Sequence, residues 1–134
     1  MKRKEDLEGK IEFQKEKVRQ EQEVLDKLRR EALDFEVLEK KKEVGNCFKS
    51  LNTTSEIRGS KKKWWQYSKI IDVNERGDFV LATFQLVDIY REYLIDIVYE
   101  YDLSHHIPIT SNEYCQEKRI FFEAVNKLLG EWEN

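Results

Sequence analysis

The stretch that decides the fold runs from residue 5 to residue 43, EDLEGKIEFQKEKVRQEQEVLDKLRREALDFEVLEKKKE. It contains no proline and a single glycine, Gly9, and it consists mainly of glutamate, lysine, glutamine, leucine and arginine. These residue types favour the α-helix. The pairs Glu23–Lys27 and Asp26–Arg30 also place acid before base at a spacing of four, which supports a helix by about 0.3 kcal/mol each. The sequence predicts one long, charged, amphipathic helix over residues 5–43.

The apolar residues of this helix follow a heptad spacing. With Ile11 at the first core position, the candidate seam for oligomerisation or docking consists of Leu7, Ile11, Val18, Leu25, Leu28, Ala32 and Phe35. Gln14 and Glu21 occupy core positions and weaken the first half of the seam. The apolar face widens over residues 24–38, and we expect that part to pack against a domain.

The charges beside the seam indicate the direction of pairing. In a parallel homodimer, Lys10 would face Lys15 of the other chain, and Glu31 would face Glu36. Both contacts are repulsive, whereas an antiparallel pair brings Lys10 near Glu31. We therefore expect a homo-oligomer with antiparallel rather than parallel pairing, or a heterologous partner.

Residues 44–134 have the pattern of a small sheet domain. Gly45 ends the helical region, and strands are expected at residues 47–51, 64–73, 79–88 and 92–101, which are rich in aromatic and β-branched residues. The sequence NERGD between the second and third of these strands predicts a hairpin turn with Gly77 at positive φ. Together these features predict a three- to four-stranded antiparallel meander, followed by a connection over residues 104–109.

A second helix is predicted at the C-terminal end of the sequence. Thr110 and Glu113 have capping-box spacing, and apolar residues follow at helical intervals from Tyr114 to Trp132. This helix, over residues 111–132, should pack on one face of the sheet. The other face is also apolar, and the late part of the N-terminal helix, a second copy of the chain or a partner could cover it. The fold class is α+β, with a helix over residues 1–43 and a domain over residues 44–134.

Composition narrows the setting of the protein. The 134 residues include 24 Lys and Arg against 27 Asp and Glu, so long-range attraction to nucleic acid should be weak. No apolar run approaches the roughly 20 residues of a membrane helix, and the N-terminal MKRKEDLEGK lacks the apolar core of a signal peptide. We expect a cytoplasmic protein that does not enter a membrane. Its two cysteines, Cys47 and Cys115, should be reduced and half-buried.

One basic and aromatic patch is a candidate nucleic-acid or partner site. It consists of Arg58, Lys61, Lys62, Lys63 and Trp64, next to Trp65. Ammonium groups beside an exposed ring can hold phosphates while a base stacks. The favoured interpretation is a solvated lysine run beside a core tryptophan pair, because proteins that bind single strands usually offer a longer basic track.

The sequence offers no catalytic, metal or cofactor motif. His105 and His106 are adjacent and are the only histidines, which does not suit a metal site. Cys115 could pair with a histidine as a nucleophile, but no supporting signature surrounds it. The five glycines are isolated, so no phosphate-binding loop is present. We predict a protein without enzymatic activity or cofactor.

The chain resembles the small accessory proteins of phages and mobile elements of low-GC bacteria. The resemblance lies in its size, its Lys-, Glu-, Ile- and Asn-rich composition, and a charged helix ahead of VGNCFKSL and WWQYSKI. It implies a non-enzymatic protein that binds a host macromolecule, such as an inhibitor of a defence complex. The main hypothesis is therefore a protein that docks or oligomerises through its helix and binds another protein. The alternatives are a small nucleic-acid- or nucleotide-binding protein and a structural assembly protein.

Overall fold

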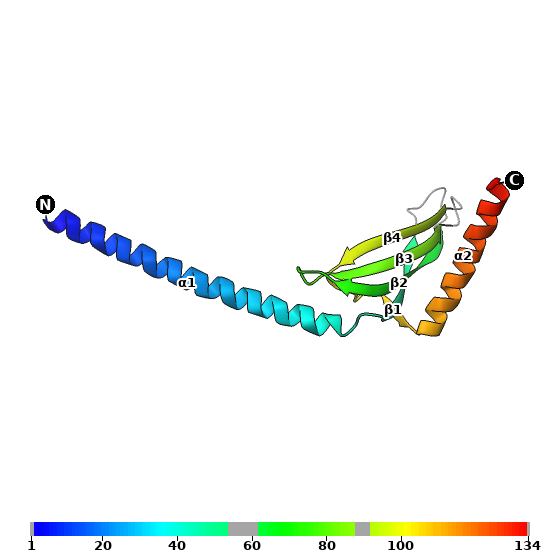
Figure 1. Cartoon of the computed structure of the whole chain (residues 1–134), viewed down its shortest axis with the longest axis horizontal. Helices are drawn as coiled ribbons and strands as arrows, with labels where there is room; N and C mark the ends of the chain where they lie inside the picture. The colour runs from blue at the N-terminus through cyan, green and yellow to red at the C-terminus, as the bar shows by residue number, and fades with distance from the viewer. Residues whose placement is uncertain (1, 54–61, 88–91, 134) are drawn as a thin grey trace. The chain divides into compact units, whose positions relative to one another are not determined.

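The computed structural model describes residues 2–53, 62–87 and 92–133. Its elements are α1 (Lys2–Lys41), β1 (Cys47–Thr53), β2 (Lys63–Val73), β3 (Phe79–Val87), β4 (Glu92–Glu100), β5 (Ile107–Ile109) and α2 (Ser111–Glu133) (Figure 1). The α+β class is confirmed. Contacts divide the chain into residues 1–36 and residues 37–134, so the last turn of α1 belongs with the sheet.

The N-terminal helix is confirmed, although its ends and its surface ion pairs differ from the prediction. It spans 40 residues and stops at Lys41, after which a turn leads to Gly45 at a φ of 99°. Glu23 pairs with Arg19 (2.7 Å) instead of Lys27. Several rotamers bring opposite charges together at spacings of three and four, so the spacing alone does not select the partner.

The sheet has five strands in the order β4-β3-β2-β1-β5, and every pairing is antiparallel. Strands β1 to β4 form the expected meander. The segment predicted as a connection contains β5, which pairs with β1 through Cys47↔Ile109. Pro108 fits this place because an edge strand does not need every backbone N–H. The prediction of three to four strands was therefore one strand short.

A bulge in β2 changes which residues share a face. The pairing between β2 and β3 shifts between Ile70 and Asp72. Strict alternation would place Val73 with Tyr67, but the extra residue moves Val73 to the face of Ile70. There it is buried with Ile70 and Leu81, on the opposite face from the one that strict alternation would give it.

The core has two parts, one on each face of the sheet. On the face toward α2, the buried residues are Cys47, Phe84, Tyr114 and Phe121. The ring of Phe84 lies 5.3 Å from the ring of Tyr67, 5.5 Å from Tyr114 and 5.2 Å from Phe121, measured between centroids. Thr110 caps α2 as predicted, because its Oγ1 accepts a hydrogen bond from the Glu113 amide at 3.1 Å.

On the opposite face of the sheet, one buried cluster is covered by other parts of the chain. Val37 of α1 and Leu103 pack against the buried cluster of Ile70, Val73, Phe79 and Leu81. Of the predicted broad face over residues 24–38, Val37 packs against this cluster, whereas Leu38 beside it is exposed. Burial of the other residues of this face stays a prediction.

Lys40 fixes the last turn of α1 to the sheet. Its Nζ donates hydrogen bonds to the carbonyl oxygens of Gly77 (2.7 Å) and Tyr101 (3.0 Å). The same ammonium group lies 3.7 Å from the centroid of the Tyr101 ring, a cation–π contact. One side chain thus joins the helix end to the β2–β3 turn and to the segment after β4.

We expect Lys40→Met to destabilise the protein by about 2 kcal/mol, because two hydrogen bonds from a charged donor are lost while the apolar stem remains. Urea unfolding followed by circular dichroism measures the change. Lys41→Met, at the exposed neighbouring position, is the matched control and should be neutral. Equal stability of the two variants would contradict this role of Lys40.

Candidate interaction surfaces

The seam predicted from the heptads is exposed along α1. Leu7, Ile11, Val18, Leu25, Leu28 and Phe35 are 40–66% exposed, and Ala32 is exposed as well. We call these seven residues the α1 seam. Leu7, Ile11 and Val18 line one shallow hollow together with Lys10, Lys15 and Gln14, so the apolar residues in the first half of the α1 seam lie on one side of the helix.

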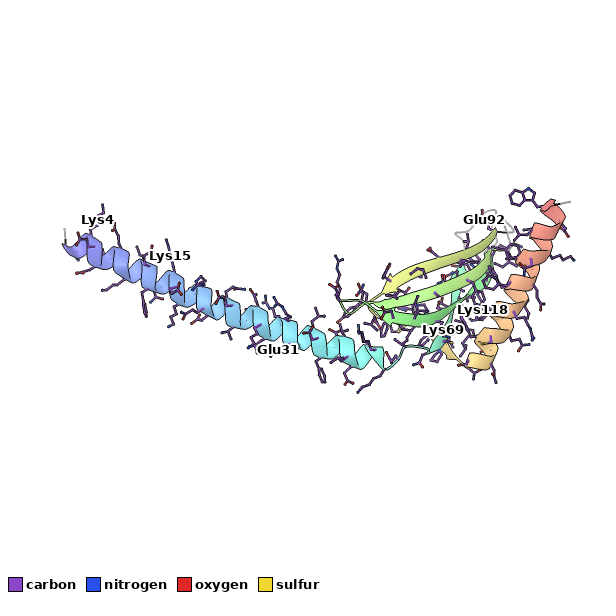
Figure 2. The ribbon with its side chains drawn as sticks, in the orientation of Figure 1. Lys4, Lys15, Glu31, Lys69, Glu92 and Lys118 are labelled. Atoms are coloured by element: carbon purple, nitrogen blue, oxygen red, sulfur yellow. The ribbon has the colours of Figure 1, made fainter. Side chains whose placement is uncertain are left out.

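The charges of α1 fall into two groups. Arg19 is held by Glu16 and Glu23 along the helix, and a hydrogen bond from Arg19 lowers the pKa of Glu16. Within the described part of the chain, Lys10 and Glu31 beside the α1 seam take part in no ion pair. Figure 2 shows the side chains spreading around the helix, with Lys4, Lys15 and Glu31 labelled.

A second apolar surface lies on the α2 face of the sheet. Helix α2 is found at the end of the sheet where β4 begins (Figure 1), and Phe121 contacts Tyr93 there at 5.4 Å between ring centroids. Further along β4, Ile95, Ile97 and Tyr99 are 47–62% exposed. Ala82 and Val80 of β3, which pair with Ile97 and Tyr99, continue the surface. We call Ile95, Ile97, Tyr99, Val80 and Ala82 the open patch.

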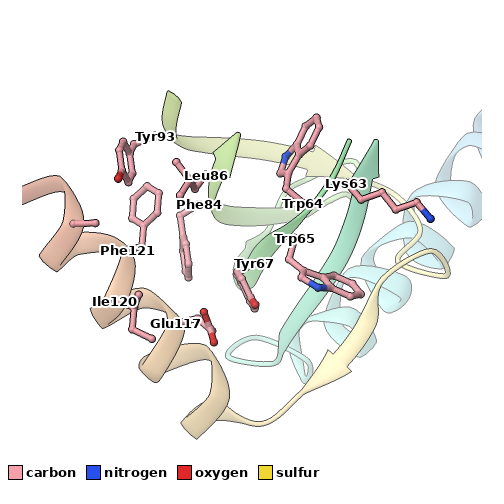
Figure 3. A pocket seen from close by; sticks show the side chains of 11 residues that line it. Lys63, Trp64, Trp65, Tyr67, Phe84, Leu86, Tyr93, Glu117, Ile120 and Phe121 are labelled. Carbon is pink, nitrogen blue, oxygen red and sulfur yellow. The ribbon is translucent and has the colours of Figure 1, made fainter. Parts of the chain in front are cut away.

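A groove of about 380 Å³ separates α2 from β2 and β3 (Figure 3). Tyr67, Phe84 and Phe121 lie side by side along it, and Glu117 of α2 contributes a carboxylate. Burial, followed by the charges of Glu117 and Glu113, raises the pKa of Tyr67. The groove presents aromatic surface with one carboxylate, that of Glu117, and one ammonium group, that of Lys63.

The predicted lysine and tryptophan patch is only partly described. Arg58 and Lys61 lie outside the described residues, while Lys62 and Lys63 are exposed and Trp64 is half-buried. The β1–β2 register pairs Trp64 with Asn52 and Trp65 with Leu51, so the two indoles lie on opposite faces of the sheet. They do not form one stacking surface.

Trp64 belongs instead to a cluster of amides that sequence reasoning missed. Its indole N–H donates to Gln85 Oε1 at 2.7 Å, and Asn52 Nδ2 donates to the same oxygen and to Gln66 Oε1, each at 3.0 Å. These four residues come from three strands. Their polar type at alternating strand positions was the available signal, but only the register brings them together.

The histidines and acidic residues do not form a metal site in the described structure. The His106 ring is buried, its Nε2 contacts the Glu100 carboxylate, and its centroid lies 6.1 Å from that of Phe48. Among the described residues, no group of three or more His, Cys, Asp or Glu is placed to hold a metal ion. No helix in the described ranges is both long and apolar enough to cross a bilayer.

The two cysteines differ in environment. Cys47 is buried and Cys115 is exposed, so the expectation that both would be half-buried was wrong. Burial raises the pKa of the Cys47 thiol, which disfavours the reactive thiolate. Cys47 is the first residue of β1 and faces α2. Amino-acid composition alone does not reveal this position.

Alkylation at pH 8 should therefore modify Cys115 in the native protein and reach Cys47 only after unfolding. Mass spectrometry of the iodoacetamide-treated chain measures the two reactions, and we expect rates at least about 100-fold apart, since the attack needs an accessible thiolate. A Cys115→Ser chain should remain unlabelled until denaturant is added. Rapid native labelling of that variant would contradict the packing of α2 on β1.

Comparison with known proteins gives no relative: no family model, curated protein or solved structure matches this chain. The α1 seam and the open patch are both exposed apolar surfaces of the described chain.

Proposed function

We propose that the protein is a non-enzymatic interaction protein that oligomerises or docks through α1 and binds another protein with its sheet domain. One observation carries the proposal: six large apolar residues of the α1 seam remain 40–66% exposed at regular heptad positions. Burying each such side chain contributes about 1.5–3 kcal/mol. A charged helix gains most of its stability from packing its apolar face, so a second helix against the seam would stabilise α1.

The open patch supports binding of a further protein. Aromatic residues and the loss of charge at the centre distinguish protein interfaces from ordinary surface. Ile95, Ile97 and Tyr99 meet this description, and they lie beside the aromatic groove under α2. An inhibitor of a host complex is the form of this proposal that the resemblance to phage accessory proteins implies.

An assembly role is the second candidate, because the α1 seam supports it as well. In that case α1 would serve as a spacer in a self-limited oligomer, and no other protein would be needed. Replacing Ile95 and Ile97 by glutamate separates the two functions: it should abolish capture of a partner while leaving the oligomer intact.

Sedimentation equilibrium of the full chain tests the proposal. The monomer has a mass of 16.2 kDa, and we expect the average mass to rise toward twice this value with a midpoint of about 1–100 µM, as for a short helical interface with two polar core positions. A chain that stays at 16.2 kDa and whose seam cross-links to no protein in a lysate would contradict the proposal.

A further inference from the structure

The α1 seam and the charges beside it contain enough information to specify how two copies pair. Resting on the self-association proposed above, we propose that α1 binds α1 of a second copy in antiparallel orientation and in one register. In this register, Ile11 packs against the partner's Leu28. The pairing uses residues 4–35, which lie inside the first contact unit of the chain.

A parallel pair is unfavourable in its core as well as on its flanks. It places Glu21 opposite the partner's Glu21 at a core position, where two carboxylates would lose water and face each other. It also places Lys10 beside the partner's Lys15. Both contacts are unavoidable in an in-register parallel dimer, because such a dimer of identical chains pairs each core residue with itself.

The antiparallel register gives every polar core residue an apolar neighbour. When Ile11 faces the partner's Leu28, Glu21 faces Val18, and Gln14 faces Leu25. Leu7 then faces Ala32. A glutamate beside valine can extend its carboxylate to water along the helix surface, which is less costly than a carboxylate pair.

The flanking charges favour the same register. Lys10 lies beside the partner's Glu31 on one side of the seam, and Glu8 lies beside the partner's Arg29 on the other. The twofold symmetry repeats both contacts, so there are four attractive pairs. None of these four residues takes part in an ion pair within the described chain, so all four side chains can turn toward a second copy.

Moving the partner helix by one heptad in either direction loses part of these favourable charge and core contacts. If Ile11 faces the partner's Phe35, Lys17 meets Glu31. However, Lys15 then meets Arg29 and Glu8 meets Glu36, so repulsive contacts outnumber the attractive one. A register with Lys10 beside Val24 leaves Phe35 and Ala32 without a partner on the other helix. The charge pattern therefore selects a single arrangement among the nearby ones.

The register places residue 37 of the two copies about 50 Å apart along the helix axis, at 1.5 Å per residue. A sheet domain follows this point in each copy, so the dimer would carry two open patches. Such a dimer would bind a repeated target with avidity, because the second contact becomes intramolecular.

Pulsed electron spin resonance of the full chain tests the register. Spin labels are placed on Asp6→Cys or Asp34→Cys in a Cys115→Ser background, since both aspartates are exposed and lie away from the seam. The register predicts an axial separation of about 40 Å between two labels at residue 6, and a close approach when chains labelled at residues 6 and 34 are mixed. Parallel pairing would reverse these two results and overturn the proposal, as would an axial separation near 30 or 50 Å between the residue 6 labels.

A charge swap provides an independent readout. Lys10→Glu should weaken the dimer about fivefold through two symmetric contacts, and adding Glu31→Lys should restore it. Lys17→Glu is the matched control, because Lys17 faces the uncharged Val24 of the partner. Tighter pairing of Lys10→Glu, or failure of the double substitution to restore affinity, would overturn the register. If the chain is still a dimer by mass in that case, the proposed function stands. A monomer at every concentration would overturn both self-association and the register.

Discussion

In a chain carrying Val18→Glu and Leu28→Glu, we expect the dimer dissociation constant to rise at least about 1000-fold. Each substitution removes an apolar side chain whose burial in the dimer contributes about 1.5–3 kcal/mol. The twofold symmetry removes each side chain from both copies, so each loss occurs twice. The introduced carboxylates would also have to lose water at the interface. Sedimentation equilibrium should show a monomer throughout the micromolar range, with α1 remaining partly helical by circular dichroism.

Phe13→Glu is the matched control for this double variant. Phe13 is 69% exposed, more than any residue of the α1 seam, yet its heptad position lies on the outer surface of the helix. Its replacement should leave the dimer unchanged. Equal loss of association in Phe13→Glu would show that nonspecific hydrophobic association, and not the α1 seam, drives pairing.

Phe84→Ala should have the largest effect on folding, a loss of about 3–5 kcal/mol in the free energy of unfolding. Phe84 is buried, and its ring contacts Tyr67, Tyr114 and Phe121, so it joins β3 to β2 and to α2. The total free energy of unfolding of a small domain is only about 5–15 kcal/mol. The urea midpoint should therefore fall steeply.

Tyr99→Ala gives the comparison on the open patch. Tyr99 is 62% exposed on β4, so its removal should change the unfolding free energy by less than about 0.5 kcal/mol. A loss below about 1 kcal/mol for Phe84→Ala, or a large loss for Tyr99→Ala, would contradict the description of which half of the α2 face is covered.

The elements with strong periodicity could be predicted from the sequence, and those set by long-range pairing could not. Helix α2 follows from the spacing of Tyr114, Phe121 and later apolar residues. Strand β5 has three residues and pairs with β1 across most of the domain, so no local pattern indicates it. The bulge at Ile70 has the same origin, because only the partner strand reveals the extra residue.

The candidate surfaces show the same division. The α1 seam follows from heptad spacing and needs no tertiary contact. The open patch depends on where α2 crosses the sheet, and the cover of the opposite face depends on Val37 and Lys40 reaching it. Sequence alternation identified both faces as apolar, but it could not determine which face would remain exposed.

Hydrogen–deuterium exchange as a function of protein concentration tests the central claim most directly, that α1 is an association surface. We expect peptides from residues 5–36 to exchange rapidly when the chain is dilute and to become protected as the concentration rises, because a solitary charged helix is only marginally stable. Peptides of β2 and β3 should be protected equally at all concentrations. Exchange of residues 5–36 that does not depend on concentration would contradict the account.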